Sequence, residues 1–188
     1  MSTPTPGWDL GDDLLPGPEV AARFLDAMSA LAATVTVITA TSPSGERTGI
    51  TATAVCSLSN DPASLVACVN RSSSLARALT TTGWFTVNLL SAEQGDVAAD
   101  FAGRTGLAGD QRFRDGLWTT HPTGAPVLRD AVASCVCHVS ASMQQATHLV
   151  VIGAVHDVIP PEPTHLRPLM YHQRRFTTVH ADDPVPVP

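Results

Sequence analysis

The segment NRSSSLARAL (70–79) brings three serine hydroxyls and an arginine to the start of a predicted helix. Helix N-terminal amides carry partial positive charge and Arg71 adds a full one, so this segment could hold a phosphate. Its hydroxyls belong to Ser72, Ser73 and Ser74. Helix capping accounts for one of these serines. An anion site and plain capping are therefore about equally supported.

A second segment, ITATAVCSLSNDP (50–62), places hydroxyls at alternating positions among small side chains. Strand pleating predicts a core face and a polar face. The core face consists of Ile50, Ala52, Ala54, Cys56 and Leu58. The polar face consists of Thr51, Thr53, Val55, Ser57 and Ser59. Short hydroxyls could hydrogen-bond the edge of a flat ring lying close to the backbone, although an ordinary half-exposed strand explains the pattern slightly better.

Other candidate groups are scattered. His148 begins an apolar strand and His172 lies in the run YHQRRF. In that run, Arg174 and Arg175 could form either a solvated surface pair or a site for a phosphate or carboxylate. The Cys135-Val136-Cys137-His138 run could suggest zinc, but alternation puts the sulfurs and the imidazole on opposite faces. We therefore predict packing cysteines and no metal site.

The common catalytic motifs are missing from the sequence. It contains no Walker loop, no G-x-S-x-G nucleophile elbow and no H-E-x-x-H pair. Gly103, Gly106 and Gly109 have neither the spacing nor the preceding strand of a dinucleotide fingerprint, so we predict a flexible loop there.

Composition narrows the class of protein. The 188 residues are 44% hydrophobic, enough for one domain with a real core. Net charge is −6 and all eleven cationic residues are arginines, which argues against a nucleic-acid partner. Apolar runs are too short to span a bilayer, and the four cysteines fall in apolar stretches typical of buried thiols in a reducing compartment. We predict a soluble cytoplasmic protein with no membrane partner.

The elements that must position these groups follow from periodicity. We expect a flexible arm over 1–18, a domain over 19–179 and a flexible tail over 180–188. Helical spacing predicts a helix to about residue 33 and another over 91–103, where Ser91 and Gln94 match a capping box and Val97 and Phe101 share a face.

The strands are predicted from runs of period two. A hairpin joins 34–41 to the strand 50–62 across a turn at 42–49, and further strands cover the ranges 64–70, 84–90, 131–143, 148–159 and 169–179. Residues 103–130 are expected to form a long surface excursion carrying Trp118, and a Pro-rich bend precedes the last strand. About seven strands joined as hairpins, with three helices, favour an antiparallel barrel.

Seven blocks occur in the order found in the short-chain flavin reductases: RFLDAMSAL, GITATAVCSLSNDP, CVNRSSS, FTVNLLSAEQ, DFAGRTGL, THLVVIGAV and LMYHQRRF. The resemblance covers residues 23–179 and is greatest to reductase components of two-component 4-hydroxyphenylacetate 3-monooxygenases. It implies a mainly β FMN-binding split barrel, a Greek-key antiparallel barrel with a few short helices, working as a homodimer. It also implies that NADH or NADPH reduces FMN or FAD, and that the reduced flavin diffuses to a separate monooxygenase acting on an aromatic substrate.

The same resemblance implies the site residues. For the flavin they are Thr48, Gly49, Ile50, Thr51, Ala52, Thr53, Ala54, Ser57, Cys68, Val69, Asn70, Arg71, Ser72, Ser73, Ser74, Phe101 and Ala102. For the nicotinamide nucleotide they are His148, His172, Gln173, Arg174 and Arg175. Hydride transfer needs the two rings stacked at about 3 to 3.5 Å and no catalytic side chain.

Two alternatives share this fold. One is an oxidase with tightly bound FMN, resembling pyridoxamine-phosphate oxidases, and the other is a non-catalytic flavin-binding module. Relatives often carry lysine around the flavin phosphate, whereas this chain has only arginine. The choices between FMN and FAD and between NADH and NADPH therefore stay open.

Overall fold

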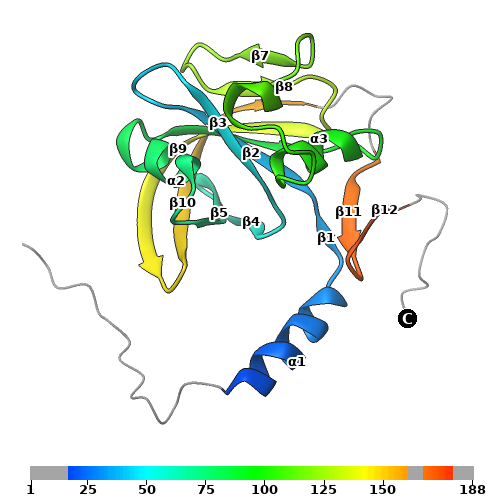
Figure 1. Ribbon diagram of the computed structural model, residues 1–188. Coiled ribbons are helices and arrows are strands. Elements are labelled where there is room, and N and C mark those ends of the chain that lie inside the picture. The colour runs from blue at the N-terminus through cyan, green and yellow to red at the C-terminus, as the bar shows by residue number, and fades with distance from the viewer. Residues whose placement is uncertain (1–16, 161–166, 180–188) are drawn as a thin grey trace, which may run out of the picture.

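A computed structural model of the chain describes residues 17–160 and 167–179 (Figure 1). Nearly all of the predicted N-terminal arm, the whole C-terminal tail and most of the Pro-rich bend lie outside the described residues. Pro18, the last residue of the predicted arm, begins the first helix.

Short helices alternate with many strands. The helices are α1 (Pro18–Ser29), α2 (Ser74–Thr81), α3 (Gly95–Phe101) and the 3-10 helix η2 (Gly109–Arg112). The strands are β1 (Ala33–Thr34), β2 (Thr36–Thr41), β3 (Arg47–Ala52), β4 (Val55–Asn60), β5 (Ala63–Asn70), β6 (Trp84–Leu89), β7 (Trp118–Thr120), β8 (Pro126–Leu128), β9 (Ala133–Gln145), β10 (His148–Ile159), β11 (Leu169–His172) and β12 (Arg175–Thr178).

The main sheet has seven strands in the order β3-β2-β6-β9-β10-β5-β4, with every pair antiparallel. Its two edge strands, β3 and β4, are separated in the chain by only Thr53 and Ala54. Two residues cannot cross the width of a flat seven-stranded sheet, because neighbouring strands lie about 4.8 Å apart. The sheet must therefore curl until its edges approach, which gives the predicted antiparallel barrel, open between β3 and β4.

This opening corrects the prediction of one strand over 50–62. The hairpin of β2 and β3 is confirmed, with Ile38 opposite Ile50, but β4 pairs with β5 on the other edge. The predicted alternation of faces is consequently wrong beyond residue 52. Leu58, assigned to the core face, is 52% exposed, and the Cys56 thiol, predicted to be buried, lies on an exposed residue.

Strand β2 is buried on both faces and separates two cores. Ile38 packs inside the barrel with Phe85, while Val37 packs outward against α3. Val97 and Phe101 of α3, which were predicted to share a face, are both buried. The helix begins at Gly95, later than the predicted start at residue 91, because residues 91–92 pair with 167–168.

The segment 103–130 lies mostly at the surface, as predicted, but it is folded and partly buried. It contains η2 and the β7–β8 hairpin, and its Phe113 is 3% exposed. Buried Asn88 anchors this hairpin, since Asn88 Oδ1 accepts from the Leu128 amide and the Ser134 hydroxyl, both at 2.9 Å. Asn88 Nδ2 donates to Val37 O at 3.0 Å. One polar side chain thus ties the excursion to the main sheet.

Differences also occur near the two ends. The strand predicted over 169–179 is a hairpin, β11–β12, with a left-handed turn at Gln173 and Arg174. Helix α1 ends at Ser29 because Ala33 and Thr34 pair with β11 instead of continuing the helix. No helix within the described residues is long and apolar enough to cross a membrane.

Candidate functional site

The serine-rich loop between β5 and α2 is organised by Asn70. Ser72 donates to Asn70 Oδ1 from its amide, at 2.9 Å, and from its hydroxyl, at 2.8 Å. The Ser73 hydroxyl caps α2 by accepting from the Ala76 amide at 3.1 Å, which confirms the predicted serine cap. Two of the three hydroxyls thus hold the loop in a defined shape before any ligand binds.

The third serine joins this loop to β3. Ser74 Oγ lies 2.5 Å from Thr48 Oγ1, and Thr48 is only 7% exposed. This hydrogen bond connects the serine-rich loop to β3, whose last residues, 50–52, begin the small-residue segment 50–62. The two bonded residues are 26 positions apart in the chain. The loop and β3 therefore adjoin at this point.

Arg71 is a cation available at the loop. It is exposed and makes no ion pair among the residues described, and its amide donates to Thr147 O at 3.1 Å. His148 is exposed beside it, because β10 begins opposite Asn70. His148 Nδ1 lies 2.9 Å from Thr147 Oγ1.

Arg47, the first residue of β3, already has an ion-pair partner. Its Nε and Nη2 donate to the two carboxylate oxygens of Asp110, at 2.6 and 2.8 Å, and its guanidinium lies over the Phe113 ring. The hydrogen bond from Arg47 lowers the pKa of Asp110, and the bond to Asp110 raises the pKa of Arg47. Among the described residues, the cations beside the serine loop that make no ion pair are Arg71 and Arg77, and Arg77 Nη1 donates to Ser72 O at 3.5 Å.

A hollow of about 190 Å³ opens beside the end of β3. Its lining residues are Val35, Thr51, Ala52, Thr53, Ala102, Arg104, Tyr171 and Phe176. The Arg104 guanidinium carbon lies 6.0 and 5.5 Å from the Tyr171 and Phe176 ring centroids. These last three residues were not predicted, although they lie inside the blocks DFAGRTGL and LMYHQRRF.

The wall of the hollow that β3 and the next residue form consists of short side chains, those of Thr51, Ala52 and Thr53. Thr51 Oγ1 donates to Ala98 O of α3 at 2.7 Å, so this hydroxyl holds α3 against β3. Thr53 and Ala54 are exposed at the corner between β3 and β4, and the Cys68 amide donates to Ala54 O at 3.0 Å. The corner is thereby fastened to β5.

Some predicted flavin residues face the interior. Val69 is fully buried, and Phe101 is 3% exposed beneath Gly49. A Cβ added to Gly49 would lie 2.8 Å from Phe101 Cε1, so the strand can approach α3 this closely only with glycine. Ser57 lies apart from the hollow, in an apolar groove beside β4. Val69 and Phe101 thus support the surface from the interior, whereas Ser57 lies away from it.

The predicted nicotinamide residues are not brought together within one chain. His148 lies at the tip of the β9–β10 hairpin, on the opposite side of the view in Figure 1 from β11–β12, which carries His172 and Arg175. At the β11–β12 turn, Arg174 Nη2 lies 2.8 Å from Asp26 Oδ1 and the Gln173 amide donates to Ser29 O. This turn holds α1.

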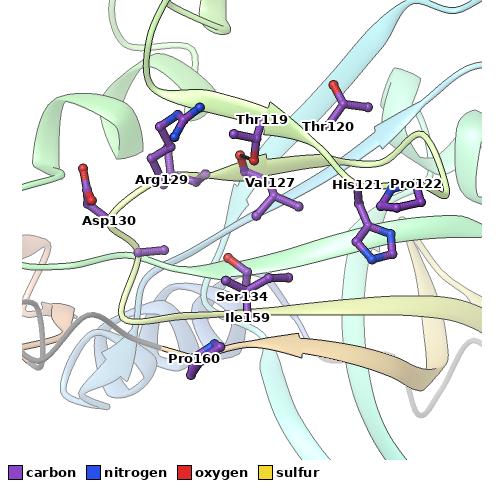
Figure 2. Close-up of a pocket in the computed structure, with 12 residues that line it drawn as sticks. Thr119, Thr120, His121, Pro122, Val127, Arg129, Asp130, Ser134, Ile159 and Pro160 are labelled. Carbon is purple, nitrogen blue, oxygen red and sulfur yellow. Dashed lines mark hydrogen bonds between the residues drawn. The ribbon is translucent and has the colours of Figure 1, made fainter.

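A larger hollow of about 380 Å³ lies between the β7–β8 hairpin and the ends of β9 and β10. Figure 2 shows His121 near one end of it and Asp130 near the other. His121 Nε2 lies 3.2 Å from Asp157 Oδ2 and Nδ1 lies 2.9 Å from Thr123 Oγ1, so both ring nitrogens are engaged. None of the predicted site residues lines this hollow.

The open antiparallel barrel, with a strand of small residues beside a serine-rich loop, agrees with the flavin-binding split barrel that the resemblance implies. The comparisons agree: residues 28–180 match the family described as flavin reductase like domain. This chain belongs to that family.

Individual relatives cover nearly the whole chain. It is 39% identical to the 4-hydroxyphenylacetate 3-monooxygenase reductase component of Salmonella typhi, over 88% of this chain and 95% of that one. It is 41% identical to the FMN reductase (NADH) RutF of Methylorubrum extorquens, over 86% and 77%. Among solved structures, BorF, the flavin reductase component of a bacterial two-component tryptophan halogenase, superposes with a TM-score of 0.75 at 28% identity, over 84% and 98%.

Proposed function

We propose that this protein is an NAD(P)H-dependent flavin reductase that reduces FMN or FAD and releases it to a separate flavin-dependent monooxygenase. The observation that carries the proposal is the hydrogen bond between Thr48 and Ser74, at 2.5 Å. It joins the serine-rich loop to β3, the strand whose last residues, Thr51 and Ala52, line the 190 Å³ hollow. A flavin has an anionic phosphate at one end and a flat ring at the other, and this surface matches that order.

The residues present fit a flavin. Exposed Arg71 and the amides at the start of α2 suit the phosphate. The threonine and alanine side chains lining the hollow let a ring come close to the β3 backbone, and the Tyr171 and Phe176 rings give it an apolar side. Arg104, held over those two rings, would place a positive charge near the ring carbonyls.

The chain's own part in the reaction is to bind and orient. When bound, the flavin and the nicotinamide supply the hydride chemistry themselves. The loop at Asn70 would hold the phosphate end, and the hollow would cover one side of the ring. Thr51 holds α3 behind β3. No side chain has to act as nucleophile or base. This agrees with the lack of hydrolase motifs in the sequence.

The nicotinamide nucleotide and the partner follow from the relatives. One relative is named as an NADH-dependent FMN reductase and others as reductase components of two-component enzymes. We propose the same arrangement here, with NADH or NADPH as donor and an oxygenase for an aromatic substrate as recipient. We also propose that His172 and Arg175 border the nucleotide, that His148 lies nearer the flavin phosphate, and that the protein is a cytoplasmic homodimer.

A direct assay tests the function. The purified protein is mixed with NADH or NADPH and free FMN or FAD in air, and absorbance of the reduced nicotinamide is followed. Rapid oxidation that depends on added flavin supports the reductase. No oxidation with any of the four combinations would overturn the proposal. A protein that purifies yellow and retains its flavin would instead favour the oxidase or the binding module.

A further inference from the structure

The hollow of about 380 Å³ beside the β7–β8 hairpin lies apart from the phosphate end of the proposed flavin site. Strand β10 begins at His148, opposite Asn70 of the serine-rich loop, and ends at Ile159, which lines this hollow. The volume is near the lower end of the range for ligand pockets, about 300 to 1,000 Å³. The hollow therefore suits a ligand that is much smaller than a nucleotide.

Two opposite charges lie at one end of this hollow. Arg129 and Asp130 both line it, both are exposed, and neither makes an ion pair with any residue that the structure describes. The backbone of Arg129 is fixed, because its amide donates to Leu117 O and its carbonyl accepts from Gln94 Nε2, each at 2.8 Å. A fixed backbone thus carries two charged groups that the described fold does not pair.

The backbone conformation of Asp130 explains how both side chains reach the same hollow. Asp130 is left-handed, with a φ of 56°. Consecutive side chains of an extended chain point to opposite sides, and a left-handed residue interrupts this alternation. Such a conformation is uncommon outside glycine, and residues that adopt it are concentrated in turns and at ligand sites.

The opposite end of the hollow is bordered by an imidazole that already has its hydrogen-bond partners (Figure 2). His121 Nδ1 accepts from the Thr123 amide at 3.3 Å, which leaves the ring proton on Nε2 to donate to Asp157 Oδ2 at 3.2 Å. Because both nitrogens are used, the ring offers a ligand a surface to pack against and no further hydrogen bond.

The floor between the two ends is aliphatic. Its lining side chains are Val127, Leu128, Ala131 and Ile159. The first three are buried, so they form a packed floor that is at most 7% exposed. A ligand that fits this order has two opposite charges at one end and an aliphatic body that extends over the floor.

We propose that this hollow binds a free α-amino acid with an aliphatic side chain. The ligand carboxylate pairs with Arg129, its ammonium group pairs with Asp130, and its side chain lies over Leu128 toward the His121 ring. A ligand with only the carboxylate would leave Asp130 unpaired and be repelled by it. A ligand with only the ammonium group would be repelled by Arg129 in the same way. This binding is separate from flavin reduction.

The first experiment measures binding by isothermal titration calorimetry on the purified protein, without added flavin or nicotinamide. The probes are L-leucine, isocaproate, which lacks the ammonium group, isoamylamine, which lacks the carboxylate, and glycine, which lacks the side chain. We expect saturable binding of L-leucine, and binding of each other probe weaker by about tenfold or more. Absence of L-leucine binding, or equal binding of isocaproate, would overturn the proposal. Flavin reduction can be confirmed whatever this result is, and the reverse.

The second experiment assigns each charge of the ligand to its side chain. Arg129→Gln should abolish the preference for L-leucine over isoamylamine, and Asp130→Asn should abolish the preference for L-leucine over isocaproate. Asparagine also tolerates the left-handed backbone, so the local fold is kept. The control is Arg23→Gln, which removes an exposed positive charge on α1 and should leave all four affinities unchanged.

Circular dichroism and thermal unfolding check that each variant is folded. If folded Arg129→Gln and Asp130→Asn bind L-leucine as tightly as the wild type, the amino acid does not bind in this hollow and the assignment is wrong. If Arg23→Gln weakens binding as much as Arg129→Gln, the effect is one of net charge, which would also overturn the proposal.

Discussion

Gly49 is the position where the candidate site and the core constrain each other most closely. A Cβ at this residue would lie 2.8 Å from Phe101 Cε1 and 2.9 Å from Ile38 O. The second atom belongs to the backbone of the paired strand β2, and Phe101 is wedged against Phe113 and Trp118, with ring centroids 5.0 and 5.3 Å away. Neither neighbour can move without disturbing a packed element. We therefore expect Gly49→Ala to shift β3.

The cost of this change follows from overpacking. An added methyl that forces packed groups apart destabilises a fold by about 1 to 3 kcal/mol. For a chain of 188 residues, that corresponds to a melting temperature lower by about 2 to 12 °C. Because β3 forms one wall of the hollow, the flavin KM should rise as well. Thermal and urea unfolding measure the first effect, and steady-state kinetics with varied flavin measure the second.

Gly95→Ala is the matched control. Gly95 begins α3, and a Cβ there would meet nothing within 4 Å. Alanine should leave stability unchanged or raise it by up to about 1 kcal/mol, because it favours the helix. The double variant Gly49→Ala/Phe101→Leu should be more stable than the sum of its single changes predicts, since the smaller side chain relieves the contact. If Gly49→Ala unfolds at the same temperature as Gly95→Ala, the close approach of β3 to Phe101 is not real.

Four further results are expected. Replacing Arg71 and Ser72 together by alanine should raise the flavin KM about tenfold or more, since a charge-assisted hydrogen bond contributes about 1.5 to 3 kcal/mol; an unchanged KM would refute the phosphate assignment. Thr53→Phe should raise flavin KM about tenfold without lowering the melting temperature, because Thr53 is exposed at the hollow, and unaltered affinity would mean that the ring lies elsewhere. The hydrogen bond from Arg47 lowers the pKa of Asp110. The ionised Asp110 therefore stabilises the fold fully above the ordinary pKa of 3.8, and this contribution is lost as pH falls through the lower pKa of the folded state. Asp110→Asn should reduce the acid dependence of urea unfolding in that range, and an identical profile would contradict this. Burial raises the pKa of the Cys137 thiol to about 12, so iodoacetamide at pH 8 should modify it only after unfolding, as peptide mass mapping would detect; modification in the native protein would exclude this burial.

The local pattern of the sequence was sufficient for most of the secondary structure. Period-two runs predicted β10 at its observed bounds and β5, β6 and β9 to within about two residues. The serine cap of α2 was also readable, because capping depends on a side chain and an amide only three residues apart. Such features depend on neighbours in the chain, so no tertiary information is needed.

The errors share a different origin. Residues 50–62 alternate like one strand, yet they divide at Thr53 and Ala54 because β3 pairs with β2 at one edge of the sheet whereas β4 pairs with β5 at the other. Residues 103–130 read as a loop because Asn88, which anchors β8, is distant in the sequence. Pairing across long separations depends on which partner is available, and composition does not carry that information.

The sequence by itself determined the fold class, the family and the two segments that a flavin could use, because hydrophobic period, turn residues and ordered blocks are properties of the linear chain. Only the tertiary structure decided that Thr48 and Ser74 meet, that Arg104, Tyr171 and Phe176 complete the hollow, and that His148 and His172 lie apart. It also revealed that no residue of α1 is buried by the rest of the described chain. These are distances between residues far apart in sequence, and they are set by how the sheet curls and closes.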